Sequence, residues 1–150
     1  MAFRLSTGLR TGLLGTWGFK ELMDNGWLDI YTGSQPTHPD YVETGTKLVR
    51  ISSTCGAGVD DGCKFGTAGT GVLPIGGVAW QGVVLADGVA GWARYYASSG
   101  TGGQTGTSGT AIRFDMSVGV SGADLNLSHT SLTTGATLTI TAANVTQPEE

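Results

Sequence analysis

Residues that could do acid–base, nucleophilic or metal chemistry are sparse in this chain, and they form no known catalytic pattern. The chain has two histidines, His38 in a proline-flanked segment and His129 in a predicted turn. A Ser-His-Asp grouping could be written from His129, Asp124 and a serine, but no Gly-x-Ser-x-Gly motif supports it. We expect both histidines to be solvated surface residues and the chain not to be an enzyme.

Metal- and phosphate-binding patterns are also incomplete. Cys55 and Cys63 lack Cys-x-x-Cys spacing and have no histidine nearby in sequence, which argues against a zinc site. They could form a disulfide, or both thiols could stay reduced, as a cytoplasm would keep them. Asp60-Asp61 lacks the further ligands of an EF-hand, and GTAGTG (66–71) lacks the lysine of a phosphate-binding loop. The sequence therefore predicts no cofactor and no metal.

Three aromatic residues could recognise a ligand by stacking. Trp80, Trp92 and Tyr95 fall in neighbouring predicted strands, where they could form an exposed platform for sugars or bases. Arg94 is the only cation close to them in sequence, which argues against nucleic acid. The alternative is that they fill the core, because aromatic side chains dominate the packing of small β proteins.

The composition suits a soluble all-β protein with a hydroxyl-rich surface. Among 150 residues there are 26 glycines, 39% of the residues are hydrophobic, and only 13% are charged, with a formal net charge of −4. The low charge excludes a solvating disordered tail, and the acidity excludes a binder of phosphate backbones. The segment 1–15 lacks the unbroken apolar run of a secretory signal, and no stretch approaches the ~18 apolar residues of a membrane span.

The first 26 residues differ from the rest and are predicted to form a helical arm. The spacing favours one short helix, or two broken near Gly15, with Ser6 or Thr7 capping the first turn. We expect Gly26 to end the helical segment in left-handed geometry. Two apolar groups follow helical spacing, and the second is expected to be buried: Leu9, Leu13 and Leu14, then Phe19, Leu22 and Met23.

After Gly26 the apolar period changes from 3.6 to 2, which predicts strands. Two long strands are expected to form a hairpin at Asp87-Gly88, a favoured turn pair. In the strand 111–118, alternation places Phe114 on one face and both Arg113 and Asp115 on the other. Further strands are predicted over 27–31, 46–52, 124–127 and 136–142, and exposed or glycine-rich loops over 33–40, 55–71 and 98–110.

These features predict a mainly β fold. About seven or eight antiparallel strands should form a β-sandwich or a partly closed barrel, with the short N-terminal helical segment covering an open end. We divide the chain into an N-terminal arm (1–26), a β domain (27–146) and a frayed tail (147–150).

A series of short motifs, in order along nearly the whole chain, resembles a family of small virion structural proteins of tailed bacteriophages. Each motif is weak alone, and the specificity lies in their succession. The segments 55–63 and 98–110 look like local additions to the pattern. The motifs are Leu5-Ser6-Thr7-Gly8-Leu9-Arg10, Leu13-Leu14-Gly15, Gly18-Phe19-Lys20, Asn25-Gly26, Ile30-Tyr31-Thr32-Gly33, Gln35-Pro36, Gly91-Trp92-Ala93-Arg94, Ile112-Arg113-Phe114-Asp115, the run 120–127 and the run 135–140.

The resemblance implies a non-enzymatic capsid decoration or cement protein. Its partners would be the major capsid protein and itself, as a homotrimer, with no direct contact to nucleic acid or membrane. It would sit on the capsid exterior after assembly in the host bacterial cytoplasm. The alternatives are a head–tail connector or tail component, and a carbohydrate-binding module that uses Trp80, Trp92 and Tyr95.

Within this interpretation the N-terminal segment is the expected contact region. It carries more apolar surface than one short helix needs for a local core, so it could dock on its own domain or on a neighbour. The predicted interface residues are Phe3, Leu5, Leu9, Leu13 and Leu14.

Overall fold

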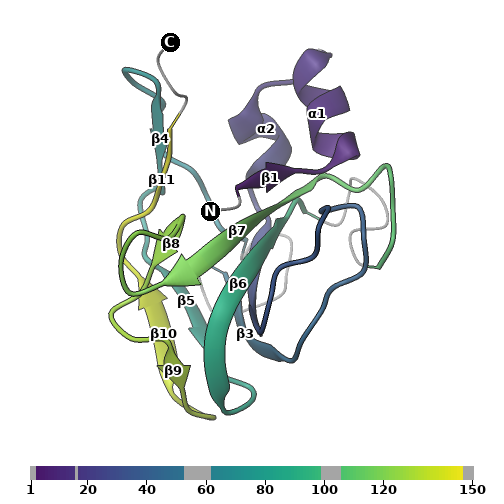
Figure 1. The fold of residues 1–150 in the computed structure, drawn as a ribbon. Helices are drawn as coiled ribbons and strands as arrows, with labels where there is room; N and C mark the ends of the chain where they lie inside the picture. The colour runs from purple at the N-terminus through teal and green to yellow at the C-terminus, as the bar shows by residue number, and fades with distance from the viewer. Residues whose placement is uncertain (1–2, 16, 53–61, 99–105, 147–150) are drawn as a thin grey trace.

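The fold of the computed structural model is mainly β, as the sequence predicts, with a short helical segment near the N-terminus (Figure 1). The structure describes residues 3–15, 17–52, 62–98 and 106–146. The main sheet has the strand order β1-β7-β6-β2-β3, and every pairing along this path is antiparallel. These strands are β1 (Arg4–Leu5), β7 (Arg113–Gly119), β6 (Gly88–Tyr96), β2 (Trp27–Thr32) and β3 (Lys47–Ile51).

Shorter strands either join this sheet at its edges or form two further two-stranded sheets beside it, which gives a partly closed barrel. Single bridges from Val49 to Val84 and from Ser52 to Gln81 link β3 to β5, which pairs with β10. β4 pairs with β11 and continues the same ribbon away from the barrel (Figure 1). β8 runs parallel to β7, and β9 pairs with the start of β6. The bounds are β4 (Val72–Pro74), β5 (Trp80–Val83), β8 (Leu125–Asn126), β9 (Ser131–Leu132), β10 (Thr137–Ile140) and β11 (Asn144–Thr146).

Two short helices of the described residues form the N-terminal arm: α1 (Thr7–Leu14) and α2 (Phe19–Met23). As predicted, Ser6 caps α1: its hydroxyl accepts from the Leu9 N–H at 3.1 Å and donates to the Ala111 carbonyl at 2.7 Å. α1 ends at Gly15, the expected break. Leu9 and Met23 are completely buried, so the arm packs on its own β domain.

The prediction for the end of the arm was wrong in one detail. Asn25, not Gly26, adopts the left-handed conformation, with φ 62°. Gly26 is required for a different reason, since a Cβ there would lie 2.1 Å from the carbonyl oxygen of Tyr96. The glycine therefore allows the arm to approach β6 closely.

The predicted hairpin at Asp87-Gly88 is also wrong, although both strands exist. β5 pairs with β10, whereas β6 pairs with β2, β7 and β9. The Asp87 carboxylate accepts from the Thr134 N–H at 2.6 Å and from the Thr134 hydroxyl at 2.9 Å, so this turn is bonded to the β9–β10 connection. The Asp-Gly dipeptide predicts that the chain reverses direction at this point, but tertiary packing decides which strands pair on either side of the turn.

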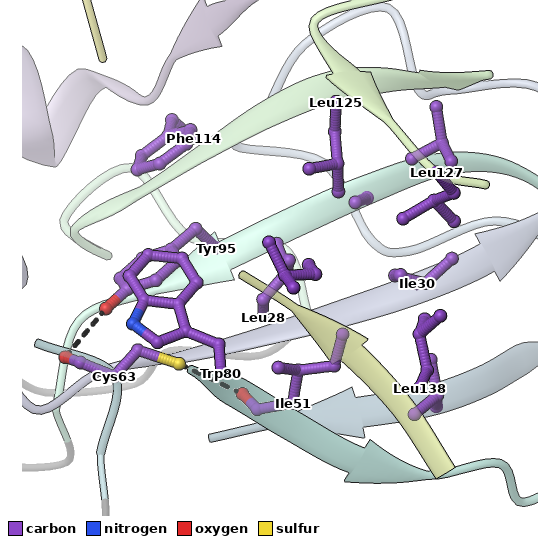
Figure 2. Close-up of a cluster of buried hydrophobic side chains, with 14 of the residues drawn as sticks. Leu28, Ile30, Ile51, Cys63, Trp80, Tyr95, Phe114, Leu125, Leu127 and Leu138 are labelled. Atoms are coloured by element: carbon purple, nitrogen blue, oxygen red, sulfur yellow. Dashed lines mark hydrogen bonds between the residues drawn. The ribbon is translucent and has the colours of Figure 1, made fainter. Parts of the chain in front are cut away.

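The core includes most of the residues predicted to face inward from β10. Leu138 and Ile140 are buried while Thr137 and Thr139 are exposed, which confirms the predicted alternation there; Ala142, expected inside, is exposed. Figure 2 shows Leu28, Ile51 and Phe114 within this core, contributed by β2, β3 and β7. The predicted tail 147–150 lies outside the described residues, and the domain division stays a prediction.

Candidate functional site

The main sheet carries a ladder of charged residues on one face. Cross-strand register places Arg50 opposite Asp29, Asp29 opposite Arg94, Arg94 opposite Asp115, and Asp115 opposite Arg4. The signs alternate along the ladder, which is the favourable arrangement for directly opposed side chains. Asp29, Arg94 and Asp115 are buried. The centre of the ladder is therefore part of the interior, whereas Arg50 at one end is partly exposed and Arg4 at the other is exposed.

Arg94 and Asp115 form the centre of this ladder. The guanidinium grips the carboxylate with two bonds, from Nε to Oδ1 at 2.5 Å and from Nη2 to Oδ2 at 2.8 Å. It also lies over the Trp92 ring, 5.3 Å from the centroid. Such a bidentate pair fixes orientation as well as charge. Burial raises the pKa of Asp115, and the bonds from Arg94 and its charge oppose that rise.

Residues 33–46, which join β2 to β3 and which we call the strap, contact the ladder at Arg94 and Arg4. Three of its carbonyls accept from arginines: Tyr41 from Arg94 Nη1 at 2.8 Å, Pro39 from Arg113 Nε at 2.6 Å, and Pro36 from Arg4 Nη1 at 2.8 Å. The fully buried Arg113 also donates to the Gly106 carbonyl at 2.6 Å. The arginines thus clamp the strap to the sheet.

Glu43 is the strap residue that reaches into this network. Its carboxylate accepts from the Tyr96 hydroxyl at 2.8 Å and lies 3.3 Å from Arg94 Nη1. Burial raises the pKa of Glu43, but hydrogen bonds from backbone N–H groups and Tyr96, together with the charge of Arg94, hold it below its ordinary value. Glu43 is therefore a carboxylate at neutral pH and ties the strap to both β6 and the segment after Gly106.

A second feature is an apolar groove of about 690 Å³ between the N-terminal arm and the β4–β11 ribbon. In Figure 1 the arm and the β4–β11 ribbon lie at the same end of the molecule. We call it the N-terminal groove. Lys20 and Glu21 contribute its charged side chains. Its apolar lining includes Phe3, Leu5, Leu13, Phe19, Leu73 and Val145.

The groove gathers three of the five predicted interface residues. Phe3, Leu5 and Leu13 line it. Leu9 does not, because it is completely buried in the chain's own core, and Leu14 is 89% exposed at the end of α1. Trp17, which sequence reasoning did not select, is 59% exposed just beyond it.

The predicted aromatic platform does not exist as an exposed surface. Trp80, Trp92 and Tyr95 are 4%, 1% and 0% exposed. Trp80 and Tyr95 pack in the core, as Figure 2 shows, and the Tyr95 hydroxyl donates to the Met23 carbonyl at 2.9 Å. Trp92 lies on the opposite face, stacked on Tyr31 at 4.6 Å. The alternation within β6 separates Trp92 from Tyr95, so the core alternative describes Trp80 and Tyr95, while Trp92 is buried on the other face, where its indole N–H donates to the Thr44 carbonyl.

The other chemistry-bearing residues do not converge. Within the described ranges no group of three or more His, Cys, Asp or Glu side chains could hold a metal ion. Cys63 is a free thiol, and burial raises its pKa to about 12; it donates to the Ile51 carbonyl at 3.3 Å. Cys55 and Asp60-Asp61 lie outside the described residues. His129 accepts or donates only locally, with Ser128 at 3.0 Å.

The sequence contained a signal for the charged ladder that motif searches miss. In a chain with 13% charged residues, the apolar segments WLDIY (27–31) and WARYY (92–96) each hold one charge, and IRFDM (112–116) holds two. Opposite signs in the centres of separate apolar strands indicate cross-strand pairs.

Comparisons with protein-family models, with curated proteins and with solved structures find no match for this chain. Neither helix of the described residues is long and apolar enough to cross a membrane.

Proposed function

We propose that this chain is a structural protein of a tailed-phage virion, a capsid decoration protein that sits on the shell and binds between major capsid proteins. The sequence resemblance suggests the class, and the N-terminal end of the molecule provides the supporting observation. There an apolar groove adjoins two of the most exposed large apolar side chains, Leu14 and Trp17. Exposed apolar surface of this kind marks protein contact sites in soluble chains.

Decoration requires no chemistry from the chain itself. A shell presents many equivalent binding positions, so a modest interface repeated many times gives large total stabilisation. Self-association into a closed ring, a homotrimer in our proposal, would place several arms on neighbouring capsid subunits together. The protein would act on the capsid exterior, with the major capsid protein as partner and without direct contact to nucleic acid or membrane.

The test is binding of the purified chain to shells from particles that lack it. The variant carries Leu14→Ser and Trp17→Ser, and the matched control carries Val89→Ser and Val120→Ser, which are 58% and 61% exposed on other elements. We expect wild type and control to bind alike, and the first variant to bind roughly tenfold more weakly or worse at an unchanged melting temperature. Failure of wild type to bind shells would refute the proposed function.

A further inference from the structure

The N-terminal groove carries one charge that has no ion-pair partner among the residues the structure describes. Lys20 lines the groove, but it forms an ion pair with Asp24 and donates to the Phe65 carbonyl at 2.6 Å. The exposed Glu21 carboxylate accepts from the Gly18 N–H at 2.8 Å and belongs to none of the ion pairs within the described ranges. The groove is therefore an apolar site of about 690 Å³ with one uncompensated negative charge in its lining.

The complementary pattern lies on the exposed side of the same arm. Leu14, 89% exposed, ends α1, and Trp17, 59% exposed, precedes α2. Arg10 lies four positions before Leu14, and residues with this spacing share one face of a helix. Arg10 is exposed, donates to the Thr7 hydroxyl at 3.1 Å and forms no ion pair with any described residue. We call Arg10, Leu14 and Trp17 the knob, which combines two large apolar side chains with one uncompensated positive charge.

The knob points away from the groove of its own chain. Leu13 lines the groove, and Leu14, the next residue of α1, is turned by about 100° around the helix axis. The two complementary surfaces therefore lie on different sides of one arm. Such surfaces form head-to-tail contacts between copies of a chain, and these contacts close into a ring where the rotation between copies allows it.

We propose that the knob inserts into the N-terminal groove of a second copy of this chain, with Arg10 of one copy beside Glu21 of the next. Leu14 and Trp17 bury their apolar surface against the groove lining, and tryptophan is enriched among the residues that dominate protein interfaces. The pair of opposite charges favours this orientation of the two copies over others. The role of the contact rests on the proposed function, because it is the contact that closes the proposed homotrimer.

Sedimentation velocity of the purified chain over a range of concentrations tests this contact. We expect wild type to form a closed oligomer, and Arg10→Glu or Glu21→Arg to weaken self-association roughly tenfold or more, because each variant brings like charges together. The double variant, Arg10→Glu with Glu21→Arg, restores opposite charges and should recover most of the affinity. The matched control is Lys64→Glu, which makes the same change of charge at an exposed residue outside the groove lining and should associate like wild type.

The apolar part of the knob is tested in the same measurement. The variant Leu14→Ser with Trp17→Ser should sediment as a monomer, and the Val89→Ser, Val120→Ser control should associate like wild type. Melting temperatures that are unchanged in all variants show that the chain still folds. Loss of the ring also weakens shell binding, because a monomer holds the shell through one set of contacts instead of several.

The outcomes separate this inference from the proposed function. If wild type stays monomeric up to about 1 mM but binds shells, the knob and the groove do not pair, while the proposed function stands. If wild type associates as predicted but binds no shells, the self-contact stands and the proposed function fails. A double charge variant no better than the single ones would overturn the pairing of Arg10 with Glu21. A wild-type dimer that does not grow would indicate a reciprocal contact, which overturns the head-to-tail arrangement.

Discussion

Two ladders of side chains cross the same strands side by side, one apolar and one charged. On the core face the register aligns Ile51, Leu28, Tyr95, Phe114 and Leu5. The adjacent residue of each strand points to the other face. There the register aligns Arg50, Asp29, Arg94, Asp115 and Arg4. The apolar ladder packs in the core, and the charged ladder is buried at its centre, where the strap contacts Arg94.

The two ladders are held by different physics. The apolar ladder is stabilised by the hydrophobic effect, in proportion to the apolar area that folding removes from water. This contribution is non-directional and does not depend on pH. The charged ladder depends on both partners of each pair being present and ionised, because an uncompensated buried charge is costly. We infer that the apolar face holds the fold together and that the charged face holds the strap in place.

Removing one charge at the centre of the charged ladder should have the largest effect. Arg94→Met leaves the Asp115 carboxylate buried without its bidentate partner and should lower the free energy of unfolding by about 4 kcal/mol. Adding Asp115→Leu should restore most of this, to within about 1–2 kcal/mol of wild type, since the double variant buries no unpaired charge. Denaturant unfolding measures both. A double variant as unstable as the single one would contradict the pairing.

Truncating a side chain of the apolar ladder should lower the free energy of unfolding somewhat less than Arg94→Met does, and the loss should not depend on pH. Leu28 is 1% exposed, and Leu28→Ala should lower the free energy of unfolding by about 3 kcal/mol through lost burial and the cavity left behind. This loss should be the same at pH 7 and pH 4, because no titratable group is removed. A loss that changed strongly with pH would show that the two faces are not independent.

Much of this arrangement could be predicted from alternation alone. The sequence correctly separates Phe114 from Arg113 and Asp115, and it correctly predicts β2, β3 and β10. Alternation cannot say which face is covered, because that depends on where a loop far along the chain folds back. The first part of the strap, 33–40, carries Pro36 and Pro39 and is predicted as a loop, but nothing local in the sequence indicates that arginines of β1, β6 and β7 will bind strap carbonyls.

The candidate site was predictable only in part for the same reason. Helical spacing marks Leu13 as an apolar arm residue, but its place in a groove depends on the ribbon of β4 and β11, strands of three residues each. Strands this short give almost no periodic signal. The aromatic platform failed because all three residues are buried, and because Trp92 and Tyr95, three positions apart in one strand, must face opposite sides.

Glu43 should make the charged face sensitive to acid. Glu43→Gln should cost about 1.5 kcal/mol at pH 7, where the wild-type carboxylate accepts from Tyr96 and faces Arg94. Because folding lowers the pKa of Glu43, its contribution is present above the unfolded-state pKa and is lost as pH falls through the folded-state value. The difference between wild type and variant in unfolding free energy should therefore shrink with acidification. A difference that is constant down to pH 2.5 would contradict this.

Shortening the segment 99–105 should have the smallest effect. This segment lies outside the described ranges, and it consists only of Gly, Ser, Thr and Gln. Loop-closure entropy changes by only about 0.6 kcal/mol per doubling of length, so removing three of these residues should shift stability by less than that. Gly106 and Ser108, which contact Glu43 and the Asp40 carbonyl, must be kept. A drop of several degrees in melting temperature would show that the segment itself supports the charged face.

The number and position of copies in the purified particle test the proposed function most directly. Counting the chain against the major capsid protein, with its density located by cryo-electron microscopy, should give hundreds of copies on the outer surface of the shell. Six or twelve copies at the neck would indicate a connector or tail component instead, and absence of the chain from the particle would contradict the account altogether.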